Sequence, residues 1–125
     1  MMIDFIARAF QNFTVKGVQI PVVYAYYFGH GEPYVVFTES DQDNVFAGDD
    51  DQEMFVGYYD FDVYAKSDYI EIFEKLKTEL KTLGFVYQPS RSSGMMYETD
   101  TRYYHRTYNF AYIVQANNEY NEVTI

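Results

Sequence analysis

The most restrictive feature of this sequence is a long run of alternating side chains from Met54 to Lys66, which reads MFVGYYDFDVYAK. A period of two is the pattern of a β-strand with one buried face. We therefore expect a strand over 54–66 whose mixed face is wet or shared with a partner. Its apolar face should meet the core, and that face carries Phe55, Gly57, Tyr59, Phe61, Val63 and Ala65.

A helix is predicted directly after this strand. Ser67 suits the N-cap position, and Gly84 stands where a left-handed C-cap is favoured. Between them, apolar side chains recur at helical spacing for four turns. These side chains are Tyr69, Ile72, Phe73, Leu76, Leu80 and Leu83.

The remaining pattern predicts an α+β fold. Ile3, Ile6, Ala7 and Phe10 follow helical spacing, so an N-terminal helix and linker are expected over 1–16. Strands are predicted at 20–28 and 34–38, which we expect to form a hairpin, and at 85–88, 95–98 and 103–115. The natural packing is one domain, 1–125. It has a mostly antiparallel sheet of four to five strands with two helices packed on one face, and a frayed tail over 117–125.

A third feature is the acidic stretch 39–53, which contains no Lys or Arg. Calcium loops of the helix–loop–helix type need Gly at the sixth position and Glu at the twelfth. Counted from Asp41, these positions hold Phe46 and Gln52, so the match fails. We interpret 39–53 as a long, flexible acidic β–β loop, with its carboxylates facing solvent or a channel. The carboxylates in question are Asp41, Asp43, Asp49, Asp50 and Asp51.

Charge and composition restrict the partners. The net charge of −10 disfavours a protein that grips nucleic acid through its phosphates. The absence of cysteine excludes thiolate zinc sites and cysteine nucleophiles. No stretch approaches the roughly 20 apolar residues that cross a bilayer, and the N-terminus lacks a signal-peptide pattern. We expect no membrane association and a location in the cytoplasm.

Candidate catalytic residues are few. Asp60 and Asp62 share one face of the predicted strand, about 7 Å apart by strand rise, a spacing that could hold an acid–base pair. His30 lies in a turn and His105 in a strand, and neither belongs to a metal-binding pattern. The sequence offers no positive argument for an enzyme, and we expect no cofactor and no metal.

Three segments resemble the tail-terminator and tail-completion proteins of long-tailed bacteriophages, the small subunits at the head–tail junction. They are PVVYAYYF with the following PYVVFT, YYDFDVYAKSDYIEIFEKLKTELKTLGF, and ETDTRYYHRTYNFAYIV. The resemblance implies an α+β subunit without catalytic residues that forms a ring, typically of six copies, on the end of the tail tube. It implies the tail tube and head-completion proteins as partners, with DNA passing nearby. The location would be the host cytoplasm during assembly and then the virion.

A ring subunit needs surfaces that its own chain leaves uncovered. We expect Val45 and Phe46 to anchor the acidic stretch on a neighbouring subunit. The wet faces of the long strands are the other candidate interface. The full candidate interface is Val45, Phe46, Met54, Val56, Tyr58, Tyr64, His105 and Ile113. Two alternatives remain open: an acidic binding module, either a DNA mimic or a cation-dependent adaptor, and a small enzyme using Asp60, Asp62 or His105.

Overall fold

The computed structural model describes residues 2–29, 31–46, 53–67 and 69–115. Its described part holds two α-helices, α1 (Met2–Ala9) and α2 (Tyr69–Thr82), and one short 3-10 helix, η1 (Pro89–Arg91). The strands, in chain order, are β1 (Thr14–Val15), β2 (Val18–Gln19), β3 (Val22–Tyr24), β4 (Tyr34–Phe46), β5 (Glu53–Ala65), β6 (Val86–Tyr87), β7 (Met96–Glu98) and β8 (Tyr103–Gln115).

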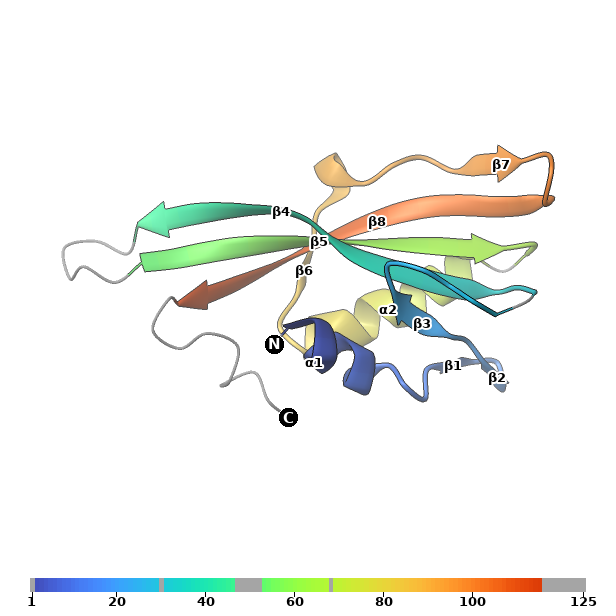
Figure 1. The fold of residues 1–125 in the computed structure, drawn as a ribbon, viewed down its shortest axis with the longest axis horizontal. Helices are drawn as coiled ribbons and strands as arrows, with labels where there is room; N and C mark the ends of the chain where they lie inside the picture. The colour runs from blue at the N-terminus through green and yellow to red at the C-terminus, as the bar shows by residue number, and fades with distance from the viewer. Residues whose placement is uncertain (1, 30, 47–52, 68, 116–125) are drawn as a thin grey trace.

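The main sheet is mixed and has the strand order β3-β4-β5-β8-β6, with β7 also paired to β8 (Figure 1). β4, β5 and β8 are each 13 residues long and form the antiparallel centre of the sheet. β6 and β7 both pair with the far edge of β8, one after the other along its length. The α+β class predicted from the sequence is confirmed.

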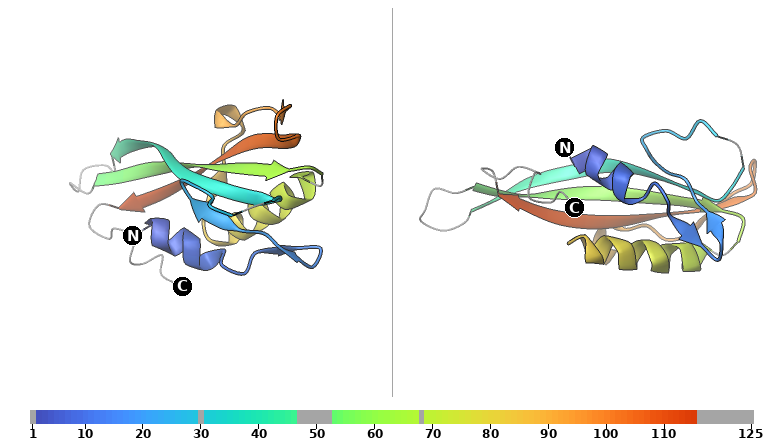
Figure 2. Two further views of the ribbon diagram at one scale, coloured as in Figure 1. Left: turned by 45° about the vertical axis from the view of Figure 1, so that its right-hand side comes forward. Right: turned by 90° about the horizontal axis from the view of Figure 1, so that it is seen from below.

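Both helices bury their apolar sides in one core against the same face of the sheet. The alternating face of β5 is buried from Gly57 to Ala65, as its period of two predicts. Phe61 is fully buried and contacts Phe10 from the segment after α1. Phe73 of α2 stacks on Tyr108 of β8, with ring centroids 3.7 Å apart. Figure 2 shows that neither α1 nor α2 lies on the opposite sheet face.

The end of α2 follows the predicted chemistry. Gly84 has a φ of +100°, in the left-handed region that glycine tolerates best. The amide of Phe85 donates to the carbonyl of Leu80 (2.9 Å), and the amide of Gly84 donates to that of Lys81 (3.0 Å). This pair of bonds is the Schellman motif, which satisfies carbonyls that the helix end leaves unpaired.

The predicted hairpin of 20–28 and 34–38 is wrong. β3 spans only Val22–Tyr24, and it pairs with β4 in parallel. A sharp turn ends β3, because Ala25 has a φ of +65° and the amide of Tyr26 donates to the carbonyl of Tyr24 (2.6 Å). Because the pairing is parallel, the two strands run side by side in the same direction and no hairpin joins them.

The bounds of the acidic loop are also wrong. β4 continues through the acidic stretch to Phe46, and β5 begins at Glu53. The pairing with β5 is interrupted once, because a β-bulge at Ser40 shifts the register between Glu39 and Asp41. Only 47–52 stand between the two strands, and they lie outside the described residues, as does the predicted tail 117–125.

Two smaller differences concern the N-terminal segment. The end of the predicted 1–16 segment forms β1, which pairs with β2 just beyond it in a two-stranded hairpin, and the turn residues Lys16 and Gly17 both have positive φ. The buried side of α1 is formed by Met2, Phe5 and Ile6, whereas Ala7 is exposed. Of the predicted stripe, Ile6 and Phe10 are buried and Ile3 packs against the core, so only Ala7 was placed wrongly. Spacing alone does not choose among neighbouring residues on a short helix.

One end of the sheet extends beyond both helices, as Figures 1 and 2 show. We call this end the arm; it consists of 43–46, 53–56 and 113–115. Asp43, Val56 and Ile113 lie in register across its three strands. The arm is part of the sheet and yet carries no helix, so it receives less support from the core than the rest of β4, β5 and β8.

Candidate functional site

The sheet face turned away from the helices, which we call the outer face, carries most of the predicted site residues. It presents the even-numbered residues of β5 and the odd-numbered residues of β8 from His105 to Ile113. Asp60 and Asp62 both lie on it, as their spacing predicts. The polar side chains of this face are held in hydrogen bonds with one another and with the segment 88–93.

Asn109 is the most buried polar side chain on the outer face, at 1% exposed. Its Nδ2 donates to Asp60 Oδ1 (2.7 Å) and to Ser40 Oγ (3.0 Å), the residue at the β4 bulge. Its backbone amide donates to Ser92 Oγ (2.9 Å). Asn109 therefore joins β4, β5, β8 and the segment after η1. Its Oδ1 is buried and finds no hydrogen-bond partner in the described part of the chain.

His105 lies between two carboxylates. Its Nε2 is 3.3 Å from Asp62 Oδ1, and its Nδ1 is 3.6 Å from Glu98 Oε2 of β7. Thr107 Oγ1 donates to the same oxygen of Asp62. A histidine that activates a nucleophile needs a ring nitrogen directed at that group. Both nitrogens of His105 face carboxylates instead, an arrangement that links β7 to the centre of the sheet.

Aromatic rings form a stack across the outer face. Tyr27 stacks on Tyr34 (4.3 Å between centroids), Tyr34 on Tyr64 (4.7 Å), and Tyr64 on His105 (4.1 Å). The four rings come from the β3–β4 connection, β4, β5 and β8. Cross-strand aromatic pairs of this kind stabilise a sheet and its register. Tyr64 and His105, predicted as interface residues, are therefore engaged within their own chain.

The stack makes the stability of the fold sensitive to alkaline pH. Burial, followed by the nearby Asp62 carboxylate, raises the pKa of Tyr64 to about 12. The folded state thus favours the protonated phenol more strongly than the unfolded chain does, where the pKa is about 10. The contribution of the Tyr64 phenol to the free energy of unfolding is therefore fully present below pH 10 and is lost as the pH rises toward 12.

We expect the thermal midpoint to fall between pH 10 and pH 12, and to fall less in the Tyr64→Phe variant, which has no phenol to ionise. Circular dichroism melts across this range measure the effect. Tyr26→Phe is the matched control, because the Tyr26 ring is 64% exposed, and it should keep the full decline. Equal declines in Tyr64→Phe and the wild type would contradict this account.

Arg91 packs on the outer face next to the arm. Its guanidinium carbon lies 3.5 Å from the centroid of the Tyr58 ring, within cation–π distance. Its terminal nitrogens lie 3.5 Å from Asp41 Oδ2 and 3.8 Å from Asp43 Oδ2. Tyr58, another predicted interface residue, is therefore covered by its own chain. Asp41 and Asp43 belong to a strand and face this arginine, so neither belongs to a free loop.

The remaining predicted residues divide into two groups. Val56 and Ile113 are neighbours on the outer face of the arm, and Ile113 is 57% exposed. The backbones of Val45 and Met54 pair with each other in the arm. The side chains of Val45, Phe46 and Met54, together with Asp49, Asp50, Asp51 and His30, lie outside the described residues.

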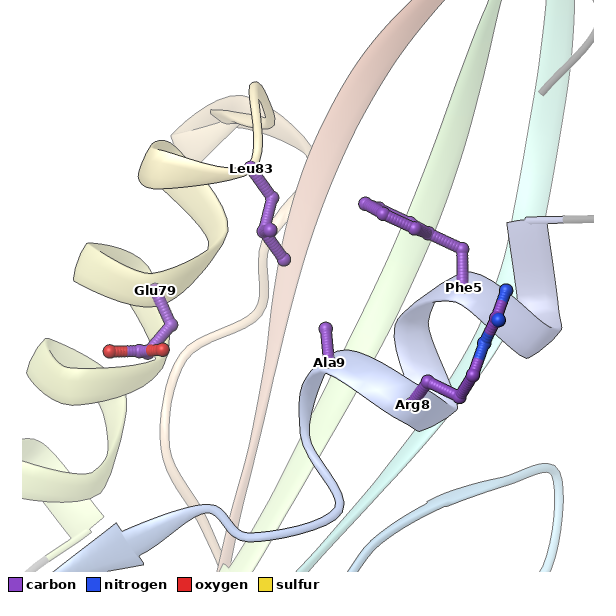
Figure 3. Close-up of a pocket in the computed structure, with 5 residues that line it drawn as sticks. All are labelled: Phe5, Arg8, Ala9, Glu79 and Leu83. Atoms are coloured by element: carbon purple, nitrogen blue, oxygen red, sulfur yellow. The ribbon is translucent and has the colours of Figure 1, made fainter. Parts of the chain in front are cut away.

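A groove that the sequence did not predict lies on the other side of the molecule, between α1 and α2 (Figure 3). It has a volume of about 320 Å³ and is lined by Phe5, Arg8, Ala9, Glu79 and Leu83. Figure 3 shows Phe5 and Leu83 directed into the space between the helices. None of the predicted site residues lines it.

Sequence reasoning missed Arg91 and Asn109. The signal for Arg91 was its position as a lone basic residue in the Pro-Ser-Arg stretch of an acidic protein. Asn109 carried a weaker signal, a polar residue between apolar neighbours in a strand. No three His, Asp or Glu side chains within the described ranges come together as a metal-binding group. None of the described helices has the length and apolar character that crossing a membrane requires.

Together these observations define an α+β protein whose mixed sheet has a helix-covered face, a polar and aromatic outer face, and a projecting arm. Comparison of the sequence with protein-family models and with curated proteins finds no match in either.

Proposed function

We propose that this chain is a structural subunit of the head–tail junction of a long-tailed bacteriophage. In this proposal it has no catalytic role and forms an oligomeric ring that completes the tail tube and joins it to the head. The observation that carries the proposal is the arm. It extends the sheet beyond the helices and exposes Ile113 beside Val56 at its surface. An exposed isoleucine beside a half-buried valine on a projecting sheet favours contact with another subunit.

The charge of the chain supports the same proposal. A ring through which DNA passes should not bind the phosphates, and carboxylates repel them over about 10 Å at 0.1 M salt. Asp41 and Asp43 lie at the base of the arm, half exposed, and share one arginine. The excess of carboxylate there favours a surface that lets a polyanion pass.

The test is the mass of the protein in solution. Light scattering across concentrations should give a mass of several chains, with six times the 14.8-kDa subunit as the specific expectation. The oligomer should also bind the ends of purified tail tubes. A protein that stays monomeric at high concentration and fails to bind tubes would exclude the proposal and favour the alternative, an acidic binding module.

A matched pair of variants localises the contact. Ile113→Lys places a charge on the arm at a side chain that is 57% exposed, so the fold should persist while the oligomer dissociates. Val18→Lys makes the same kind of change at a 52% exposed residue of β2, away from the arm, and should leave the oligomer intact. Equal oligomerisation of the two variants would show that the arm is not the contact.

A further inference from the structure

In the part of the chain that the structure describes, both edges of the central three-stranded sheet lack a partner strand near the arm. On one side, β3 pairs with β4 only from Val35 to Phe37. On the other side, β6 pairs with β8 at Ala111 and Phe110, and β7 pairs further back. Within the described residues, neither the edge of β4 beyond Phe37 nor the edge of β8 from Ile113 to Gln115 has a partner strand.

An unpaired edge presents backbone N–H and C=O groups that are satisfied by water or by another strand. Natural sheets blunt exposed edges with bulges and charges, and β4 has both, in the bulge at Ser40 and the carboxylates of Asp41 and Asp43. Two β4 edges brought together would oppose these carboxylates, which disfavours a two-fold contact through β4. The free edge of β8 in the arm, from Ile113 to Gln115, carries no charged residue.

We propose that the arm of one subunit pairs through the free edge of β8 with the free edge of β4 on a second copy of this chain. The two edges lie on opposite sides of the same sheet, so each copy can contact two neighbours. Such a head-to-tail contact generates a ring when its rotation closes. This inference rests on the proposed ring and specifies which surfaces make it.

The direction of the new strand pair follows from the topology. β4 and β8 are both antiparallel to β5, so they run parallel to each other. If the sheet continues from one subunit to the next in the same sense, β8 pairs in parallel with the neighbour's β4. The outer face then also continues across the contact, and Ile113 comes next to Asp41 or Asp43 of the neighbour.

Cysteine crosslinking tests this pairing, because the natural chain has no cysteine. The double variants Asp41→Cys/Ile113→Cys and Asp43→Cys/Ile113→Cys place both thiols on the outer face. Oxidation should join successive copies, so that a non-reducing gel shows a ladder of bands up to the ring size. Asp41 and Asp43 are two residues apart on the same face of β4. Testing both positions allows for two possible registers between β8 and the neighbour's β4.

Gln42→Cys/Ile113→Cys is the matched control. Gln42 lies opposite Gly57, on the helix-covered side of the sheet, so its thiol points away from the thiol at 113. We expect roughly tenfold less crosslinking in this variant, because a disulfide needs Cβ atoms within about 4.5 Å. Crosslinking as strong as in the outer-face variants would overturn the pairing.

The single-cysteine variants distinguish the proposed β8–β4 contact from two-fold contacts through β4 alone or β8 alone. Asp43→Cys alone and Ile113→Cys alone should stay uncrosslinked; a dimer from either would show a two-fold contact through β4 or β8 and overturn the inference. Light scattering under reducing conditions is measured on each variant. An oligomer of normal mass without a ladder in both outer-face variants refutes the pairing and leaves the ring proposal standing. A monomeric wild type refutes both.

Discussion

Replacing Phe61 with alanine is expected to lower the free energy of unfolding by about 3–5 kcal/mol, the range for large aromatic side chains removed from a packed core. Phe61 is fully buried at the centre of β5. Its ring stacks on Phe37 and meets Phe110 edge-on, in both cases with centroids 5.6 Å apart, and it contacts Phe10. The substitution would remove contacts with two neighbouring strands and with the segment after α1 at once.

Urea unfolding followed by circular dichroism measures this loss. Phe28→Ala is the matched control, because the Phe28 side chain is 86% exposed, and its effect should stay within about 0.5 kcal/mol. Since whole domains are stable by only about 5–15 kcal/mol, the Phe61 variant could be largely unfolded at 37 °C. A loss below about 1.5 kcal/mol would contradict the central place of Phe61 in the core.

The second large effect concerns Asn109. Changing Asn109 to Asp would replace an amide donor with a carboxylate beside Asp60, in a site that is almost closed to solvent. Two like charges at hydrogen-bond distance cannot both ionise without a large cost, so one of them should keep its proton. We expect a destabilisation of about 3 kcal/mol at neutral pH, comparable to other uncompensated buried charges.

The pH dependence identifies the cause of this loss. In the folded Asn109→Asp variant the shared site should hold the pKa of a carboxyl above its ordinary value of about 4. The folded state would then bind a proton more tightly than the unfolded state, so the variant is most stable at low pH and loses stability as the pH rises above 4.

Asn109→Leu separates the charge from the loss of hydrogen bonds. It removes the donors to Asp60 and Ser40 without adding a carboxylate. Relative to the wild type, its destabilisation should be nearly the same at pH 4.5 and at pH 8, whereas that of Asn109→Asp should grow. If both variants respond to pH in the same way, Asp60 does not face residue 109 as the structure places it.

Local sequence patterns correctly predicted those elements in which buried and exposed side chains alternate regularly along the chain. The period of two in β5 and β8 arises because alternate residues of a strand face opposite sides, and here one side is the core. α2 was predicted from its apolar spacing and from Gly84, whose positive φ is a local requirement. In these elements the local preference and the tertiary environment agree, which makes the prediction reliable.

The errors lie where pairing partners are distant in the chain. In the sequence, the acidic stretch around Asp41 and Asp43 has the composition of a solvated loop. The strand nevertheless continues through it, because β5 supplies backbone hydrogen-bond partners and Arg91 faces both carboxylates. The direction of β3 beside β4 depends on the path of the segment that connects them. The alternating pattern of β3 fits a parallel and an antiparallel pairing equally well.

The sequence by itself determined the α+β class, the buried face of β5, the extent of α2 and the strongly acidic character of the chain. Each of these depends on residue type and on spacing along one segment. Only the tertiary structure decided that Tyr64 and His105 stack together, that Arg91 covers Tyr58, and that Asn109 joins three strands. These contacts join residues far apart in the chain, so they form only when the register of the sheet brings them onto one face.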